Sequence, residues 1–389
     1  MWRFLVSSIA IAVSATALAA ESIPLSDWQI GYTECRTDIP AGRHANIITM
    51  RAYTIQADGS KRVALYPQLS EEPNSWTQFA GWSPDGRYAI VGRGWEDPEN
   101  AKWEEEHKDF RFSQGWLYDT YLADMQADTL LNITAVDRVS TYNSGLFFWP
   151  KDPNLLGFTA LIEGKSHPFS MALDGTNKKD LTTDSKQFSY GFNASPDGSR
   201  IAFHQDYVIV IANADGSNPQ KIDNGNQFNF APTWSPDGKW LLFVSGEHYN
   251  CHPYIVAADG TGLRKMADRG GYTGVVAFLD VPDFHGGSSD VPVWSMDTKG
   301  FYYTTKIGDT IELMYCTLDG TMSQLTTSAP GVIQYHPKPS PDGQWLLFGS
   351  TRDGARNLYV MPAKGGDVKP VTTLPKGSAA MWAIWRPRE

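Results

Sequence analysis

The chain contains the stretch Phe230-Ala231-Pro232-Thr233-Trp234-Ser235-Pro236-Asp237-Gly238, followed by Trp240-Leu241-Leu242-Phe243-Val244. A Pro-Asp-Gly turn between an aromatic stretch and an alternating apolar stretch is typical of a β-hairpin. The same turn recurs at Ser83–Gly86, Ser195–Gly198 and Ser340–Gly343, with degenerate copies at Pro150–Pro153 and Ser295–Asp297. The repetition predicts a fold built from hairpins.

A second kind of turn follows each of these hairpins about twenty residues later. It occurs at Ala57–Gly59, Ala127–Asp128, Leu173–Gly175, Ala214–Gly216, Ala258–Gly260, Leu318–Gly320 and Lys364–Gly366. Two hairpins make a four-stranded blade, and a repeat of about 40 to 45 residues is typical of β-propellers. We therefore predict an all-β fold, a seven-bladed propeller, with six blades as the alternative.

The two ends of the chain are expected to share one blade. Residues 28–66 supply three strands without an innermost one, and Ala380–Pro387 reads as an innermost strand without partners. Joining them closes the ring and protects the sheet edges. The other six blades are predicted over residues 77–134, 142–182, 188–222, 229–268, 288–326 and 335–373.

Composition and the start of the chain limit the class of protein. With 41% hydrophobic and 20% charged residues the chain is globular, and its net charge of -10 argues against nucleic-acid binding. Only three cysteines are present, so the fold is no disulfide scaffold. Residues 1–20 read as a signal peptide, which predicts a mature domain over 21–389, periplasmic or secreted, with no further membrane span.

The motifs Trp234-Ser235-Pro236-Asp237-Gly238 and Leu358-Tyr359-Val360-Met361 resemble those of TolB-like propellers built from WD40-like repeats. The resemblance covers nearly the whole mature chain and implies a propeller fold. It says little about activity, because propellers include scaffolds, binding proteins and enzymes.

Histidines gather at one end of the predicted blades. The Asp-Gly turns lie at one end of the blades, which we call the turn face. The opposite end, which we call the connection face, carries the loops between second and third strands and the connections from one blade to the next. All eight histidines are placed at or near the connection face: His44, His107, His167, His204, His248, His252, His285 and His336. Imidazole is a common metal ligand and a common acid or base, so this bias indicates a site.

A divalent metal ion, Mn, Ca or Zn, is one interpretation of this gathering. Two or three of four histidines are the predicted ligands: His248, His252, His285 and His336. Gln334 or a carboxylate would complete the site. The other interpretation is that these are separate histidines, each with a local role.

Further residues complete the predicted site. The predicted acid, base or other catalytic groups are His204, His252 and Tyr272, and the predicted substrate contacts are Arg269, Asn250, Tyr190 and Asp290. An insertion over residues 95–115 in the second blade is either a helical lid over the same face or a solvated loop.

Two functions remain open. The first is a carbon-oxygen lyase that binds and cleaves an acidic glycan, since His336-Pro337-Lys338-Pro339 resembles the His-Pro-His-Pro segment of oligogalacturonate lyases, with Lys338 in place of the second histidine. In that chemistry a cation neutralises a uronate carboxylate and a base removes the adjacent proton. The second is a non-catalytic propeller that binds a periplasmic protein or a glycan.

Overall fold

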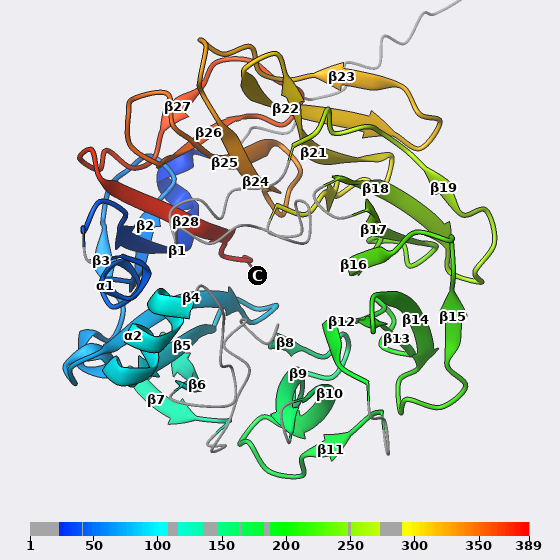
Figure 1. The fold of residues 1–389 in the computed structure, drawn as a ribbon, viewed down its shortest axis with the longest axis horizontal. Helices are drawn as coiled ribbons and strands as arrows, with labels where there is room; N and C mark the ends of the chain where they lie inside the picture. Colours follow the sequence, from blue (N-terminus) through cyan, green and yellow to red (C-terminus); the bar gives the residue numbers. More distant parts are fainter. Residues whose placement is uncertain are drawn as a thin grey trace, which may run out of the picture.

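Seven four-stranded antiparallel sheets are arranged around a central axis (Figure 1). The structure is a computed structural model, and it describes residues 23–40, 42–107, 116–134, 146–162, 165–182, 187–247, 250–272 and 290–388. The seven-bladed prediction is confirmed, and each expected blade range overlaps one observed sheet.

Blades are numbered along the chain, and their strands run outward from the axis except where the ring closes. Blade 1 contains β28 (Ser378–Trp385), β1 (Gln29–Arg36), β2 (Arg51–Gln56) and β3 (Val63–Ala64). Blade 2 contains β4 (Ser75–Trp82), β5 (Tyr88–Glu96), β6 (Trp116–Asp124) and β7 (Thr129–Asn132). Blade 3 contains β8 (Phe147–Phe148), β9 (Leu155–Ile162), β10 (Lys165–Ala172) and β11 (Lys179–Asp180). Blade 4 contains β12 (Ser189–Ala194), β13 (Arg200–Gln205), β14 (Val208–Asn213) and β15 (Gln220–Ile222). Blade 5 contains β16 (Phe228–Trp234), β17 (Trp240–Glu247), β18 (Asn250–Ala257) and β19 (Arg264–Lys265). Blade 6 contains β20 (Val293–Trp294), β21 (Gly300–Ile307), β22 (Thr310–Thr317) and β23 (Met322–Gln324). Blade 7 contains β24 (Gln334–Pro339), β25 (Trp345–Ser350), β26 (Asn357–Pro362) and β27 (Lys369–Pro370).

Helices are few in the described ranges. The short helix α1 (Arg43–Ile47) lies between β1 and β2, and α2 (Pro98–His107) lies between β5 and β6, so both belong to the connection face. Two 3-10 turns, η1 (Leu25–Asp27) and η2 (Pro67–Ser70), complete the set. The insertion predicted at 95–115 therefore contains a helix in its first half, and residues 108–115 lie outside the described ranges.

The Ser-Pro-Asp-Gly turns of the turn face share one hydrogen-bond pattern. In blade 5 the Ser235 hydroxyl donates to Asp237 Oδ1 at 2.7 Å and accepts the Trp240 amide at 3.0 Å. Asp237 Oδ1 also accepts the Lys239 amide at 3.2 Å, and Gly238 takes the positive φ of 71° that a residue with a side chain disfavours. The motif recurs because serine and aspartate satisfy the turn's own backbone donors.

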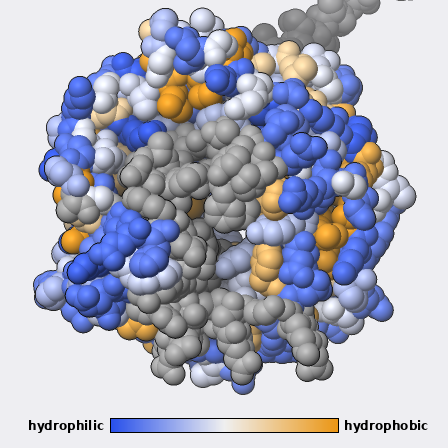
Figure 2. Space-filling model, in the orientation of Figure 1, coloured by the Kyte–Doolittle hydropathy of each residue, from blue (hydrophilic) through white to orange (hydrophobic). Residues whose placement is uncertain are grey.

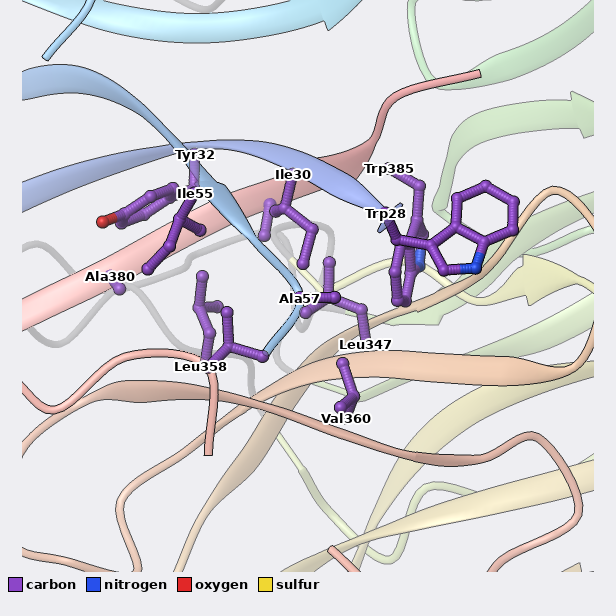
Figure 3. Close-up of a cluster of buried hydrophobic side chains, with 12 residues drawn as sticks. Trp28, Ile30, Tyr32, Ile55, Ala57, Leu347, Leu358, Val360, Ala380 and Trp385 are labelled. Atoms are coloured by element: carbon purple, nitrogen blue, oxygen red, sulfur yellow. The ribbon is translucent and has the colours of Figure 1, made fainter. Parts of the chain in front are cut away.

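The C-terminal strand closes the ring, as predicted. β28 pairs antiparallel with β1, and Ile30 lies opposite Trp385. Trp28 and Trp385 meet edge to face at 5.7 Å, and they pack with Leu347 and Val360 of blade 7 in a buried cluster (Figure 3). Burial of this apolar surface holds the two chain ends together.

Tryptophans at the ends of innermost strands connect neighbouring blades. The indole N–H of Trp385 donates to the Lys338 carbonyl at 2.9 Å, and that of Trp294 donates to the Thr233 carbonyl at 3.0 Å. Trp82 makes the matching bond to the Ile384 carbonyl at 3.2 Å. In these three blades the indole thus satisfies a carbonyl of the preceding blade.

Candidate functional site

A buried ion pair lies at the connection face between blades 5, 6 and 7. Arg269 Nη2 is 3.9 Å from Asp290 Oδ2, and each side chain is 1% exposed. Asp290 Oδ2 also accepts hydrogen bonds from Thr304 at 2.7 Å and from Tyr272 at 3.0 Å. The His336 amide donates to Asp290 Oδ1 at 2.9 Å. Four predicted site residues therefore meet here, but they bond to one another.

Burial governs protonation around this ion pair. Burial and the Asp290 charge raise the pKa of Tyr272 well above its ordinary value, so its hydroxyl stays protonated and donates. Burial lowers the pKa of the Lys338 ammonium, which the nearby Asp290 carboxylate partly opposes. The network therefore connects blades through fixed hydrogen bonds.

His252 anchors the connection that follows β19. Its Nδ1 accepts the Arg269 amide at 3.2 Å, and its Nε2 is 3.7 Å from Asp268 Oδ2. Burial and the Lys265 charge lower the pKa of His252, so the neutral ring suits this acceptor role.

In other blades the position equivalent to His252 is occupied by a different residue, which also anchors the connection leaving its blade. Glu312 Oε1 accepts the Ser328 amide at 2.9 Å, and Asn357 Oδ1 accepts the Leu374 amide at 2.7 Å. His167 Nδ1 bonds the hydroxyl of Thr182 at 3.0 Å. Each anchor residue lies within the first three residues of the third strand of its blade and holds the connection leaving the same blade. The six described histidines do lie towards the connection face, but two of them have this structural role.

Two described members of the predicted metal set already have hydrogen-bond partners within the protein. His252 Nδ1 already accepts a backbone amide, and Gln334 Nε2 donates to Ser328 at 2.8 Å. Within the described ranges, no group of three or more His, Cys, Asp or Glu side chains could hold a metal ion. His248 and His285 lie outside those ranges, so the four-histidine prediction stays a prediction. Asn250 is exposed at the start of β18, away from the buried ion pair's hydrogen bonds.

The other two predicted site residues belong to an aromatic cluster at the connection face of blades 4 and 5. We call it the aromatic platform, and it consists of Phe188, Tyr190, His204, Tyr207, Phe228 and Phe230. Tyr207 packs edge to face on Phe188 and on Phe228, at 4.9 Å in both cases, and stacks with His204 at 6.2 Å. Phe188, Tyr190 and Tyr207 remain half-buried, so the cluster presents aromatic surface.

Strained backbone places Tyr207 in the platform. Asp206 and Tyr207 form the tight turn between β13 and β14 with φ of 43° and 65°, a region that tyrosine rarely adopts. Asp206 secures the turn by accepting the Gln187 side chain at 2.6 Å and the Phe188 amide at 3.2 Å. Asn229 donates to the Tyr207 carbonyl at 2.8 Å. Strain retained at an aromatic residue often marks a functional position.

Sequence reasoning selected Tyr190 and His204 but missed the rest of the platform. A signal was present: Phe188 and Tyr190 precede Ser195 by the same intervals at which Phe228 and Phe230 precede Ser235. Paired aromatics at one register in neighbouring innermost strands predict a shared surface.

No helix in the described part of the chain is long and apolar enough to cross a membrane.

Comparison with known proteins identifies relatives by sequence. Residues 204–389 match the TolB beta propeller domain of the PD40 family. An uncharacterized protein of Agrobacterium fabrum is 24% identical over 207 residues, 52% of this chain and 59% of the relative. The Tol-Pal system protein TolB of Bordetella pertussis is 29% identical over 161 residues, 41% of this chain and 33% of that protein. The chain thus spans less than two thirds of the length of these curated relatives.

Solved structures extend the likeness to most of the chain. TolB from Acinetobacter baumannii matches with a TM-score of 0.51 and 16% identity, over 94% of this chain and 68% of that one. An oligogalacturonate lyase in complex with manganese matches with a TM-score of 0.55 and 14% identity, over 82% of this chain and 83% of that one. At such identities the likeness shows the fold alone. By sequence, residues 204–389 are thus similar to the TolB beta propeller domain, and the described chain as a whole has a β-propeller fold.

Proposed function

We propose that this chain is an exported propeller, periplasmic or secreted, that binds a glycan on the aromatic platform of its connection face without cleaving it. The observation that carries the proposal is the platform itself: half-buried rings of Phe188, Tyr190 and Tyr207 held in place by packing on buried neighbours. Aromatic faces carry negative charge density that attracts the C–H groups of a sugar ring. Because the rings are already ordered, binding costs little conformational entropy.

Polar groups beside the platform suit a sugar as well. Burial, Tyr190 and Asp206 raise the pKa of Tyr207, so its hydroxyl stays neutral and can donate a hydrogen bond. Asp206 is exposed at the same turn. Binding sites typically combine an apolar surface with a few such polar groups that fix orientation.

Lyase chemistry fits the described residues less well. A lyase needs a base with a pKa near the working pH and a cation exposed to the uronate carboxylate. Tyr272 donates a hydrogen bond to Asp290 and has a raised pKa, and the Arg269 side chain is only 1% exposed. Both groups are committed to the buried network, so binding without turnover is the better-supported function.

Glycan-array binding followed by calorimetry on the purified chain tests the proposal. We expect Tyr207→Ala to weaken glycan binding about tenfold, from the loss of one aromatic contact. Tyr315→Ala removes a half-buried tyrosine of blade 6 and is the matched control, with no expected effect. Absorbance of unsaturated uronate should not rise on incubation with polyuronates. Turnover, or binding of proteins with no glycan bound, would contradict the proposal.

A further inference from the structure

Asp206 carries the charge of the aromatic platform. The rings of the platform come from residues 187–190, 203–208 and 226–231. Within these three segments Asp206 is the only Asp, Glu, Lys or Arg. Its side chain is exposed at the turn that also holds Tyr207. The segments that supply the aromatic surface therefore bring one negative charge to it and no lysine or arginine.

The turn holds the Asp206 carboxylate in place without neutralising it. The Asp206 amide donates to the Phe188 carbonyl at 3.0 Å, and the Phe188 amide donates back to Asp206 Oδ1 at 3.2 Å. Gln187 Nε2 donates to Asp206 Oδ2 at 2.6 Å. In the described part of the chain no basic side chain forms an ion pair with this carboxylate. A carboxylate accepts about four hydrogen bonds, so two neutral donors leave its charge and part of its capacity available.

The rings and the carboxylate favour the same sign of ligand charge. Burial, Tyr190 and Asp206 raise the pKa of Tyr207, which places the carboxylate close enough to act on the Tyr207 hydroxyl. Aromatic faces also carry negative charge density and attract a cation that lies within about 6 Å of the ring centre. Both sources of potential are negative, so the platform disfavours an anionic ligand and favours a cationic one.

We propose that the glycan bound by the aromatic platform carries free amino groups, and that Asp206 pairs with an ammonium group of this amino sugar. The inference rests on the proposed glycan-binding function, because the C–H groups of the same sugar contact the rings. An exposed ion pair is weak alone, but an ammonium between a carboxylate and aromatic faces gains from both. The carboxylate is already held by the turn, so pairing costs little further ordering.

Paired oligosaccharides test this directly. Glucosamine and glucose oligomers of equal length and linkage differ at C2, where one carries an ammonium and the other a hydroxyl group. Calorimetry at low salt and about pH 5 keeps carboxylates ionised and amines protonated. We expect the wild type to bind the glucosamine oligomer at least about fivefold more tightly, from one ion pair and one cation–π contact.

Asp206→Asn should lower the affinity for the glucosamine oligomer to that for the glucose oligomer. Asparagine keeps an oxygen that accepts the Phe188 amide, and it tolerates the φ of 43° at this position. The variant should therefore unfold within a few degrees of the wild type, as thermal denaturation can check. A preference that survives in Asp206→Asn overturns the inference.

The turn between β21 and β22 supplies the matched control. Asp309 is exposed there at the connection face of blade 6, which contributes no ring to the platform. Ile307 pairs with Thr310, so this turn has two residues, as the equivalent turn of blade 4 does. Asp309→Asn should keep the preference for glucosamine. An equal loss in Asp206→Asn and Asp309→Asn would reflect only the net charge of the protein and overturn the inference.

Raised salt tests the charge in the unmodified chain. Salt screens exposed charges, so the preference of the wild type for glucosamine should shrink as the salt concentration rises. A preference that salt leaves unchanged would have a cause other than charge and would contradict the proposed pairing.

The outcomes separate this inference from the proposed function. Equal binding of both oligomers overturns the inference and leaves the glycan-binding function standing. Binding of neither also overturns the inference, and the glycan-binding function then falls only if the glycan array shows no other ligand. Oligolysine carries ammonium groups without sugar rings. Tighter binding of oligolysine than of the glucosamine oligomer would indicate a basic peptide as the ligand and overturn the inference.

Discussion

Side chains accept backbone amides at both the turn face and the connection face, but the residues that do so differ between the two. At the turn face, one serine and one aspartate satisfy the backbone donors in blade after blade, as in Ser195 with Asp197 and Ser340 with Asp342. At the connection face, the anchor position holds His252, Glu312 or Asn357, and each accepts an amide of the following connection. Figure 2 shows that hydrophilic and hydrophobic side chains mix on the face it presents.

The difference teaches that a repeat can preserve a residue or preserve only a role. A turn of four residues fixes its own geometry, so the same side chains recur. An anchor must match a connection whose length and path differ between blades, so its side chain varies. Variation at the connection face is what leaves room for a binding site.

The largest effect should come from breaking the buried network of the connection face. Asp290→Ala leaves the Arg269 charge buried without its carboxylate, and we expect a loss of about 3–5 kcal/mol in the free energy of unfolding. Urea denaturation followed by tryptophan fluorescence measures it. Asp38→Ala, which removes an exposed pair with Arg36, should cost less than about 1 kcal/mol. Equal losses for the two variants would show that the Arg269 pair is not buried.

The turn face should dominate the response to acid. Hydrogen bonds from Ser195 and the Ser199 amide lower the pKa of Asp197 to about 2, and bonds from Arg87 and the Ala127 amide lower that of Asp124 to about 2. An unfolded aspartate titrates near about 3.9. The folded pKa is lower, so this stabilisation is complete above about pH 4 and is lost as the pH falls towards about 2.

Circular dichroism against pH checks this expectation. Ser195→Ala removes the main cause of the low pKa of Asp197, so acid unfolding should begin at a higher pH than in the wild type. An unchanged acid midpoint would mean that the turn carboxylates do not contribute to stability.

A single turn should contribute less, and equally in every blade. Ser235→Ala removes the hydroxyl that bonds Asp237 and the Trp240 amide, for an expected loss of about 1–2 kcal/mol. Ser340→Ala, in the equivalent turn of blade 7, should cost the same within error. Denaturant unfolding of both variants tests this, and clearly unequal losses would break the equivalence of the turns.

The smallest effect on stability is expected at the platform. Tyr207→Asn loses aromatic packing but relieves the positive φ of 65°, which asparagine tolerates, so stability should change by less than about 1 kcal/mol. Glycan affinity should fall about tenfold, as for the alanine variant. A stability loss as large as that of Asp290→Ala would indicate a structural role for Tyr207.

Most of the fold could be predicted because its causes are local. A Ser-Pro-Asp-Gly turn makes its own hydrogen bonds, so each copy marks a hairpin, and counting turns gives the blades. Ring closure followed from an unpaired strand pattern at each end, and β28 does pair with β1. The histidine bias towards the connection face was visible too, but its explanation depends on partners that only the folded chain brings together.

The candidate site could be predicted only in part for that same reason. We selected Arg269 and Asp290 as substrate contacts, but in the folded chain they pair with each other. The spacing of the two residues in the sequence does not reveal this pairing, because the path of the connection between blades differs from one blade to the next. Arg356 stands in a turn that reads as ordinary chain reversal. Its Nη1 atom is buried without a hydrogen-bond partner in the described part of the chain, and such a feature exists only after folding.

Blade 1 sets the order of events in folding. Blades 2 to 7 are each continuous in sequence, so each can begin to form as soon as its own residues are available. Blade 1 pairs Ile30 with Trp385, so β1 keeps an open edge until nearly the whole chain has emerged. Long-range pairings form slowly, and an open edge invites aggregation. The last step of folding is therefore the one most exposed to misassembly, and it determines how quickly the chain becomes a closed ring.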